Sequence, residues 1–282
     1  MVLSLLNVCA GRRRGVIALL TICTLVSPIV GGAAQAIRAG GTGSALATLT
    51  RLAEAYRRVN PEFQLDVVPN LGSSGGVKAL LSGKVDLAAT SRPLRSGEMD
   101  SGARSIAYGR TPFVFATTEP DVTGLSLAEI AAIYEDRMTA WKSGHRIRLI
   151  LRPANDYDTV ILESFSPAIK AAVTKIMTRE GMNLALTDQD AVNAIESVPG
   201  ALGTASLALL ISEHRHARAL AINGIAPTPA NLASGQYPYA KDMYFVVGKD
   251  APASVLKFLE FVTSKGGQQV LAETGHIPPP KR

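Results

Sequence analysis

The chain has 282 residues and a formal net charge of +6, with 47% hydrophobic and 18% charged residues. This composition is typical of a folded globular protein and excludes a wholly disordered chain. Aromatic residues make up only 5% of the chain, which disfavours a stacking surface for single-stranded nucleic acid. The one dense basic run, Arg12–Arg14, lies close to the N-terminus. We therefore expect no nucleic-acid partner.

Residues 1–36 have the three parts of a secretory signal peptide. Arg12–Arg14 form a basic region, and the apolar stretch 15–30 follows it without a charge. Ala34-Gln35-Ala36 matches a small-x-small cleavage site, and the apolar stretch is short for a membrane-spanning helix. We expect export to the periplasm with cleavage after Ala36; the alternative is an uncleaved anchor.

Cleavage at this position removes both cysteines of the chain, Cys9 and Cys23. It also removes three arginines and no acidic residue, so the formal charge falls from +6 to +3. A mature protein without cysteine excludes disulfides, zinc–thiolate sites and cysteine nucleophiles.

Strand-like and helix-like segments alternate along the rest of the chain. The apolar spacing of Leu46, Leu49 and Leu52, for example, predicts a helix. The expected strands are 36–39, 64–69, 85–89, 112–117, 147–151 and 243–247. The expected helices are 42–58, 74–81, 126–134, 156–165, 189–197, 253–262 and 267–273. This order predicts an α/β fold with parallel sheets flanked by helices, whose ligand sites are the strand-to-helix loops.

Four of these loops carry donors suited to an anion. They are Gly40–Ser44, Gly72–Gly76, Thr90–Pro93 and Arg152–Asn155. Glycine lets backbone N–H groups approach a ligand, hydroxyls donate further hydrogen bonds, and helix N-termini favour negative charge. The loops containing Arg92 and Arg152 add guanidinium groups suited to an oxyanion. Together they predict a small-anion site that needs no metal and no cofactor.

The stretch 70–94, Asn-Leu-Gly-Ser-Ser-Gly-Gly through Ala-Thr-Ser-Arg-Pro-Leu, resembles the signature of phosphate-binding periplasmic proteins. These are the solute receptors of phosphate ABC transporters and have the class II periplasmic-binding-protein fold. Residues 130–141, 198–203 and 237–247 resemble further segments of the same family. The resemblance covers nearly all of the chain after the signal peptide.

The resemblance implies a two-lobed α/β protein that binds phosphate or a similar oxyanion and delivers it to a membrane permease. It implies a binding protein, not an enzyme, and we expect a monomer. Lobe 1 is expected over 37–111 and 243–282, and lobe 2 over 112–242. Thr42, Gly43, Ser73 and Arg152 match ligand positions of the family. The full set of expected ligand-binding residues is Thr42, Gly43, Ser44, Ser73, Ser74, Gly75, Ser91, Arg92, Arg152, Asn155, Asp156 and Thr159.

Two positions depart from the family pattern. Arg92 stands where well-known phosphate receptors have an aspartate that accepts the ligand's proton. The segment 156–159, Asp-Tyr-Asp-Thr, stands where the family has Ser-Gly-Thr. One hypothesis is that the acceptor role has moved to Asp156 or Asp158 and that Arg92 binds the anion directly. The other is that both aspartates only cap the helix that follows.

Two other functions remain open from the sequence. A periplasmic sensor or interaction protein would keep the fold with altered or lost anion binding. An exported serine hydrolase is the lesser alternative, because Gly72-x-Ser74-x-Gly76 matches a nucleophile-elbow pattern and His276 is a candidate base. A metal site at His214 and His216 is disfavoured, because two residues separated by a single residue on a helix point to different faces.

Overall fold

The computed structural model describes residues 36–280, so the predicted signal peptide, apart from its last residue, lies outside the described residues. The strands are β1 (Ile37–Gly41), β2 (Leu65–Val68), β3 (Leu87–Thr90), β4 (Arg104–Thr117), β5 (Gly124–Leu125), β6 (Arg148–Leu151), β7 (Asn183–Leu184), β8 (Ala201–Ser206), β9 (Arg218–Ala219), β10 (Ala221–Ile222) and β11 (Ala240–Val247). The helices are α1 (Gly43–Arg57), α2 (Gly72–Leu81), α3 (Ser96–Asp100), α4 (Leu127–Tyr134), α5 (Tyr157–Glu163), α6 (Pro167–Ile176), α7 (Asp188–Ser197), α8 (Leu207–Ser212), α9 (Pro229–Ala233), α10 (Ala253–Thr263) and α11 (Lys265–Glu273). No helix in this part of the chain has the length and apolarity that a membrane crossing requires.

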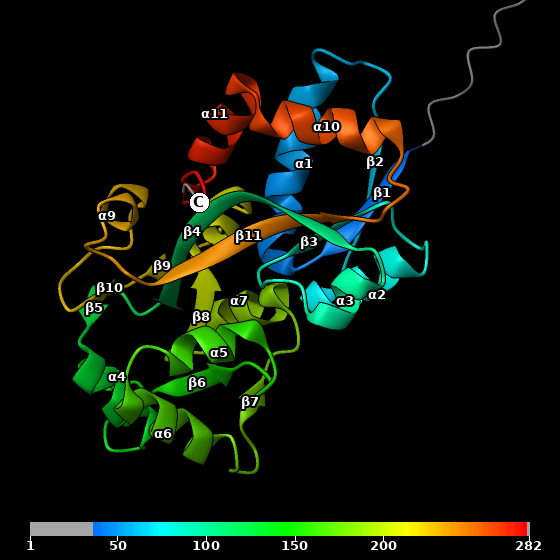
Figure 1. Cartoon of the computed structure of the whole chain (residues 1–282). Helices are drawn as coiled ribbons and strands as arrows, with labels where there is room; N and C mark the ends of the chain where they lie inside the picture. The colour runs from blue at the N-terminus through cyan, green and yellow to red at the C-terminus, as the bar shows by residue number, and fades with distance from the viewer. Residues whose placement is uncertain (1–35, 281–282) are drawn as a thin grey trace, which may run out of the picture. The chain divides into compact units, whose positions relative to one another are not determined.

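One half of the sheet, called the first half, is built on three parallel strands. β1 lies between β2 and β3, and β11 continues the sheet antiparallel to β3 (Figure 1). Leu49 and Leu52 of α1 pack with Phe245 of β11 and Phe258 of α10 in one hydrophobic cluster. Val77 of α2 belongs to a separate cluster. The amphipathic helices thus bury their apolar stripes around this sheet.

The other half of the sheet, called the second half, repeats this design with different strands. β6 lies between β7 and β8 and is parallel to both. The larger hydrophobic cluster joins Ile130 of α4 and Ile169 of α6 to Phe113 and Phe115 of β4. A second cluster holds Val192 of α7.

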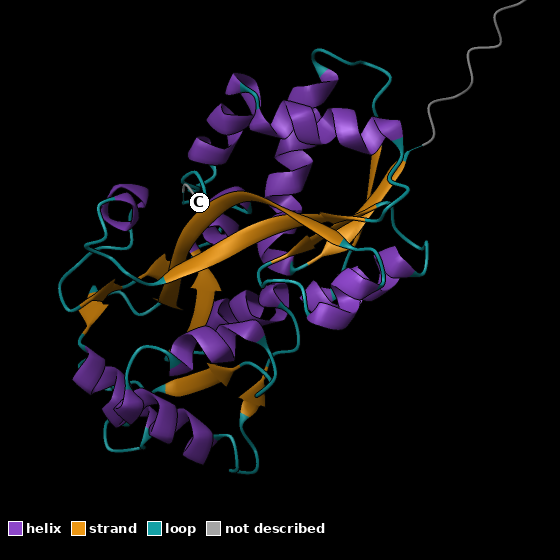
Figure 2. Ribbon diagram, in the orientation of Figure 1, coloured by secondary structure: helices purple, strands orange, loops and turns teal. Residues whose placement is uncertain are grey.

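Two long antiparallel strands connect the halves. β4 and β11 pair along their length, and β4 continues into the second half, where residues 113–116 pair with β8. They run side by side through the centre of Figure 2. The expected strand 112–117 is therefore only the end of a strand of 14 residues. Residues 104–111 have no uninterrupted apolar run, so this part of the strand was not predicted. The first residues of β4 are exposed or half-buried, and the strand becomes fully buried only after it crosses between the halves.

The predicted α/β fold with helix-flanked sheets is confirmed, and the parallel pairs flank an antiparallel crossing. Ser126 and Glu129 form a capping box at the start of α4. The helices α3, α6, α8 and α9 and the short strands β5, β7, β8, β9 and β10 were not predicted from the sequence. Pro167 at the start of α6 and Ser166 as its N-cap are local signals that predict this helix.

Candidate functional site

A cavity of about 430 Å³ lies where loops of the two halves face each other. It is bounded by the start of α2 and the loop after β3 from the first half, and by the loop after β6 from the second. Nine of the twelve expected ligand residues line it: Thr42, Ser73, Ser74, Gly75, Ser91, Arg92, Arg152, Asn155 and Asp156. Segments far apart in the sequence are thus brought together at the carboxyl ends of parallel strands.

The wall from the first half is a cluster of hydroxyl groups. Ser73 Oγ accepts a hydrogen bond from the Ser91 backbone N–H at 3.1 Å and lies 3.3 Å from Ser91 Oγ. Gly76 makes this close packing possible, because a Cβ atom there would lie 2.7 Å from Gly41 Cα. The start of α2 therefore rests directly on the end of β1.

Arg92 extends from the loop after β3 and is held by a carboxylate. Its two terminal nitrogens lie 2.9 and 2.7 Å from the carboxylate oxygens of Glu98, and one also donates to Ser74 Oγ at 3.1 Å. The hydrogen bonds from Arg92 hold the pKa of Glu98 below its usual range. Most of this guanidinium is thus engaged within the protein.

Arg152 approaches the cavity from the end of β6. It donates to the Ala185 carbonyl at 3.1 Å and to Asp156 Oδ2 at 2.8 Å. The other oxygen of Asp156 accepts the Asp158 backbone N–H at 2.9 Å, so Asp156 caps α5. One oxygen of Asp156 thus caps α5, and the other pairs with Arg152.

Each arginine keeps one buried donor without a partner. The side chains of Arg92 and Arg152 line the cavity, and both residues are only 6% exposed. The Nε atom of each is buried and has no hydrogen-bond partner. A buried N–H without an acceptor costs free energy, so these two donors favour a ligand that supplies acceptors.

Three expected ligand residues lie outside the cavity wall. Gly43 is covered by Gln189, whose Oε1 would lie 2.0 Å from a Cβ at that position. Ser44 is buried and donates to Asp188 Oδ1 at 2.8 Å. Thr159 Oγ1 donates to the carbonyl of Pro153 at 2.9 Å and so fixes the loop after β6. These three groups have protein partners in place of a ligand.

Behind the cavity lies a buried charge network that the sequence analysis missed. Lys241 Nζ from β11 lies 2.5 Å from Asp158 Oδ1 and 2.9 Å from Asp188 Oδ1. Lys241 Nζ also donates to Ser44 Oγ at 2.8 Å. All three charged side chains are almost inaccessible to solvent.

Burial and charge act in opposite directions on this network. Burial raises the pKa of Asp158 to about 6, despite the opposing charge of Lys241. Burial also opposes ionisation of Asp188, but the charges of Lys241 and Arg152 outweigh it and lower its pKa. The two carboxylates together raise the pKa of Lys241, against the effect of its burial. Lys241 and Asp188 are therefore charged at neutral pH.

A sequence signal for Lys241 was present. Lys241, Met243 and Phe245 occupy alternate positions of β11, so Lys241 lies on the same buried face of the strand as the two apolar residues. A lone lysine in such a register requires a buried anionic partner. Thr187 and Asp190 cap α7, so the Asp188 side chain is not needed for that role.

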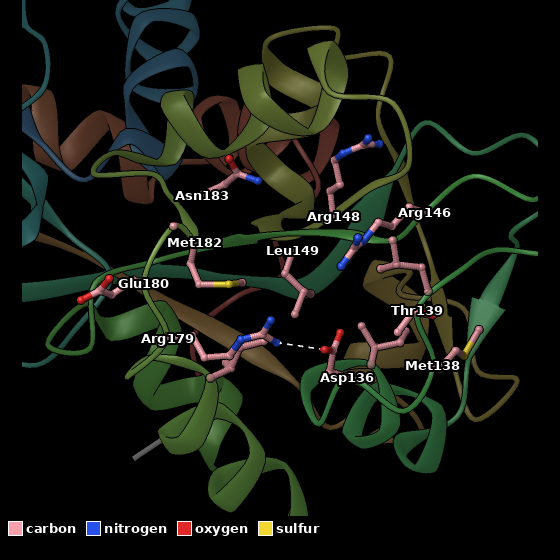
Figure 3. Close-up of a pocket in the computed structure, with 14 residues that line it drawn as sticks. Asp136, Met138, Thr139, Arg146, Arg148, Leu149, Arg179, Glu180, Met182 and Asn183 are labelled. Atoms are coloured by element: carbon pink, nitrogen blue, oxygen red, sulfur yellow. Dashed lines mark ion pairs between the residues drawn. The ribbon is translucent and has the colours of Figure 1, made fainter.

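A second hollow, of about 260 Å³, lies at the opposite end of β6 (Figure 3). Arg146, Arg148 and Arg179 surround it, and Arg179 forms an ion pair with Asp136 at 3.2 Å. All three arginines are exposed. The first cavity is therefore the better candidate site, because its donors are buried.

The geometry does not favour the hydrolase alternative. Within residues 36–280, the hydrogen bond found for Ser74 Oγ comes from Arg92, and His276 Nδ1 pairs with Thr274. His276 is buried, and burial lowers its pKa to about 4. In the same part of the chain, no three His, Cys, Asp or Glu side chains are grouped to hold a metal ion.

Comparison with known proteins agrees with this architecture. The family model described as the PBP superfamily domain matches residues 28–265. The chain belongs to the PBP superfamily. The fold of the chain is similar to a substrate-binding protein from Clostridium perfringens with bound phosphate, at 19% identity and a TM-score of 0.73 over 87% of this chain and 100% of that one. It is also similar to the molybdate-binding protein of Azotobacter vinelandii, at 13% identity and a TM-score of 0.62 over 86% of this chain and 100% of that one.

Curated relatives carry the predicted family resemblance. Protein SphX of Synechococcus elongatus is 24% identical over 93% of this chain and 83% of its own. The phosphate-binding protein PstS of Borreliella burgdorferi is 21% identical over 84% of this chain and 88% of its own. The resemblance to phosphate-binding periplasmic proteins is thereby confirmed. At these identities the superfamily and the fold are established, and the ligand of this chain is a separate question.

Proposed function

We propose that this PBP superfamily member is an exported receptor for phosphate or a related tetrahedral oxyanion. The observation that carries the proposal is that Arg92 and Arg152, each with a buried and unpartnered Nε–H, line one cavity from opposite halves. An oxyanion supplies acceptors to both donors and to the hydroxyls of Ser73 and Ser91. The names of the relatives favour phosphate among the oxyanions.

The two halves act, in this proposal, as lobes hinged at β4 and β11, with boundaries near residues 111 and 243. Closure would exclude water and strengthen the hydrogen bonds to the anion. The closed form would deliver the anion to the permease of an ABC transporter, with the receptor working as a periplasmic monomer. The separate hydrophobic clusters of the two halves support this division.

Calorimetry tests the proposal directly. Protein stripped of endogenous ligand is titrated with phosphate, sulfate and molybdate in a buffer free of phosphate. We expect Arg152→Gln to weaken anion binding about 10- to 100-fold, because a charged hydrogen bond contributes about 1.5–3 kcal/mol. Arg148→Gln is the matched control, since Arg148 begins the same strand and lies at the second hollow. Equal binding by both variants contradicts the proposed site.

The structure also bears on which aspartate accepts a ligand proton. Both aspartates line the cavity, but both oxygens of Asp156 are engaged, by Arg152 and by the α5 backbone, whereas Asp158 pairs with Lys241 through Oδ1 and burial raises its pKa to about 6. We propose Asp158 as the acceptor. Asp158→Asn is then expected to reduce the preference for phosphate over sulfate, because only phosphate carries a proton at neutral pH. Asp156→Asn is the control, and an unchanged preference in Asp158→Asn contradicts this role.

The sensor alternative has one observation in its favour. Glu98 and Asp156 already pair with the two cavity arginines, and such pairing reduces the attraction for a dianion. Absence of binding to all three anions, together with capture of a specific partner protein, would favour the sensor.

A further inference from the structure

The second hollow, at the other end of β6, shares no lining residue with the proposed receptor cavity (Figure 3). Its whole wall comes from one segment of the chain, residues 133–183. The shape of the hollow therefore does not depend on how the two halves are placed or on any closure around an oxyanion. With a volume of about 260 Å³, it lies just below the range of about 300–1,000 Å³ that is usual for ligand pockets.

The floor of this hollow is apolar. Ile133, Leu149 and Ile176 line it, and each of them belongs to the larger hydrophobic cluster of the second half. Met138 and Met182 are half-buried, line the same hollow and pack against that cluster. Covering apolar surface is favourable because it releases water from that surface. The floor therefore favours a ligand with an apolar body over a bare, strongly hydrated inorganic anion.

Two arginines on the rim of the hollow have no acidic partner within residues 36–280. The Arg146 side chain forms no hydrogen bond or ion pair with this part of the chain, and Arg148 donates to the Pro199 carbonyl at 2.7 Å. Both arginines are exposed, so their guanidinium groups are accessible to a ligand. A guanidinium group presents pairs of N–H donors whose geometry matches a carboxylate.

The third arginine of the hollow is already paired. Arg179 lies 3.2 Å from Asp136, and Figure 3 shows this pair across Leu149 from Arg146. Glu180 also lines the hollow, but its carboxylate points away from Arg146 in Figure 3. The uncompensated positive charge of the hollow therefore lies at Arg146 and Arg148.

We propose that this hollow is a second binding site, which takes a small organic anion with an apolar body and one carboxylate. The apolar body covers the floor, and the carboxylate accepts hydrogen bonds from Arg146 and Arg148. A ligand of about ten heavy atoms in such an open site is expected to have a dissociation constant of about 1–10 mM. The proposal does not rest on the proposed receptor function, because the two sites share no residue.

Methionine-methyl NMR tests this site directly. Protein exported from the full-length chain is labelled with ¹³C at the methionine methyl groups, and the signals are assigned with Met→Leu variants. Benzoate and octanoate are the probes, because each joins one carboxylate to an apolar body. We expect both probes to shift the signals of Met138 and Met182 in a saturable manner. Met99, which is 53% exposed on α3 and does not line the hollow, is the internal control and should not shift.

Two matched probes separate the charge from the apolar body. Acetate carries the carboxylate without the body, and benzyl alcohol carries the ring without the charge. Both are expected to bind more weakly than benzoate. Benzyl alcohol that binds as tightly as benzoate overturns the role of the arginines, and acetate that binds as tightly overturns the role of the floor.

Exposed arginines can be replaced with little risk to folding, which circular dichroism checks. Arg146→Gln is expected to weaken benzoate binding about 2- to 5-fold, the effect of one ion pair close to solvent. Arg146→Gln/Arg148→Gln should weaken it about 4- to 25-fold if the two effects add. Arg57→Gln is the matched control, because Arg57 is exposed on α1 and lines neither site, and it should bind benzoate as wild type does.

The outcomes are independent of phosphate binding. No shift of Met138 and Met182 with either probe overturns the second site, and so does an equal shift of Met99, which indicates non-specific binding. Unchanged benzoate affinity in the double arginine variant also overturns it. Weaker benzoate binding with unchanged phosphate calorimetry in the same variant supports it. If wild type fails to bind phosphate but binds benzoate at the hollow, the receptor proposal fails and the second site stands.

Discussion

Lys241 offers the sharpest test of how the buried network stabilises the fold. The Lys241→Met substitution keeps a long side chain and removes the only cation that contacts both Asp158 and Asp188 in the described structure. Breaking a buried ion pair by removing one partner costs about 3–5 kcal/mol, because a buried charge is left uncompensated. In a domain of this size each kcal/mol lowers the melting temperature by about 2–4 °C. We therefore expect the melting temperature to fall by about 6–20 °C.

The loss of stability in Lys241→Met depends on pH. The pKa of Asp158 is already raised to about 6 in the folded protein, above the value of about 3.9 for an unfolded aspartate. A raised carboxyl pKa means that the folded state binds the proton more tightly, so this stabilisation is lost as pH rises from about 4 through 6. Loss of Lys241 raises the pKa further. The melting-temperature difference between wild type and variant is therefore expected to be smaller at pH 5 than at pH 8.

Differential scanning calorimetry at both pH values measures this effect. Lys257→Met is the control, because Lys257 is exposed on α10, and its effect should stay within about 0.5 kcal/mol. Adding Asp158→Asn to Lys241→Met should recover part of the lost melting temperature, since it removes one of the two buried carboxylates that are left without a cation. If the melting temperature of Lys241→Met falls by less than about 2 °C, or if the difference from wild type is the same at pH 5 and pH 8, this account of the network is refuted.

Three further predictions concern the fold and its processing. Gly76→Ala is expected to lower the melting temperature by about 2–12 °C, because overpacking costs about 1–3 kcal/mol, whereas Gly75→Ala, with its nearest neighbour at an ordinary 3.6 Å, should change it little. Trp141→Phe removes the buried hydrogen bond from Nε1 to the Gly200 carbonyl at 3.0 Å and should lower the free energy of unfolding in urea by about 1–3 kcal/mol. Anion affinity should not change, because Trp141 does not line the first cavity, and a loss of affinity would contradict this expectation. Mass spectrometry of the exported protein should find the N-terminal sequence Ile-Arg-Ala-Gly from Ile37, whereas an intact residue 1 would support the uncleaved anchor.

The sequence by itself determined the local features of this protein. Apolar spacing placed α1, and the pairing of Ser126 with Glu129 fixed the start of α4, because both depend on residues within one or two helical turns. The motif at 70–94 identified the family and the loops that line the cavity. Glycines and hydroxyls at helix starts have a local chemistry that a sequence pattern retains.

Only the tertiary structure decided which of these hydrogen-bond donors remain available to a ligand. Ser44 and Lys241 are 197 positions apart and share a hydrogen bond, and Asp188 reaches Thr42 across 146 positions. No local spacing encodes such pairs, because they follow from how β11 and α7 pack against α1. The same packing buried Gly43 and Ser44. The assembled fold also buries the Nε atoms of Arg92 and Arg152 without partners. Burial decides the energetic value of each polar group, and burial is a property of the assembled fold.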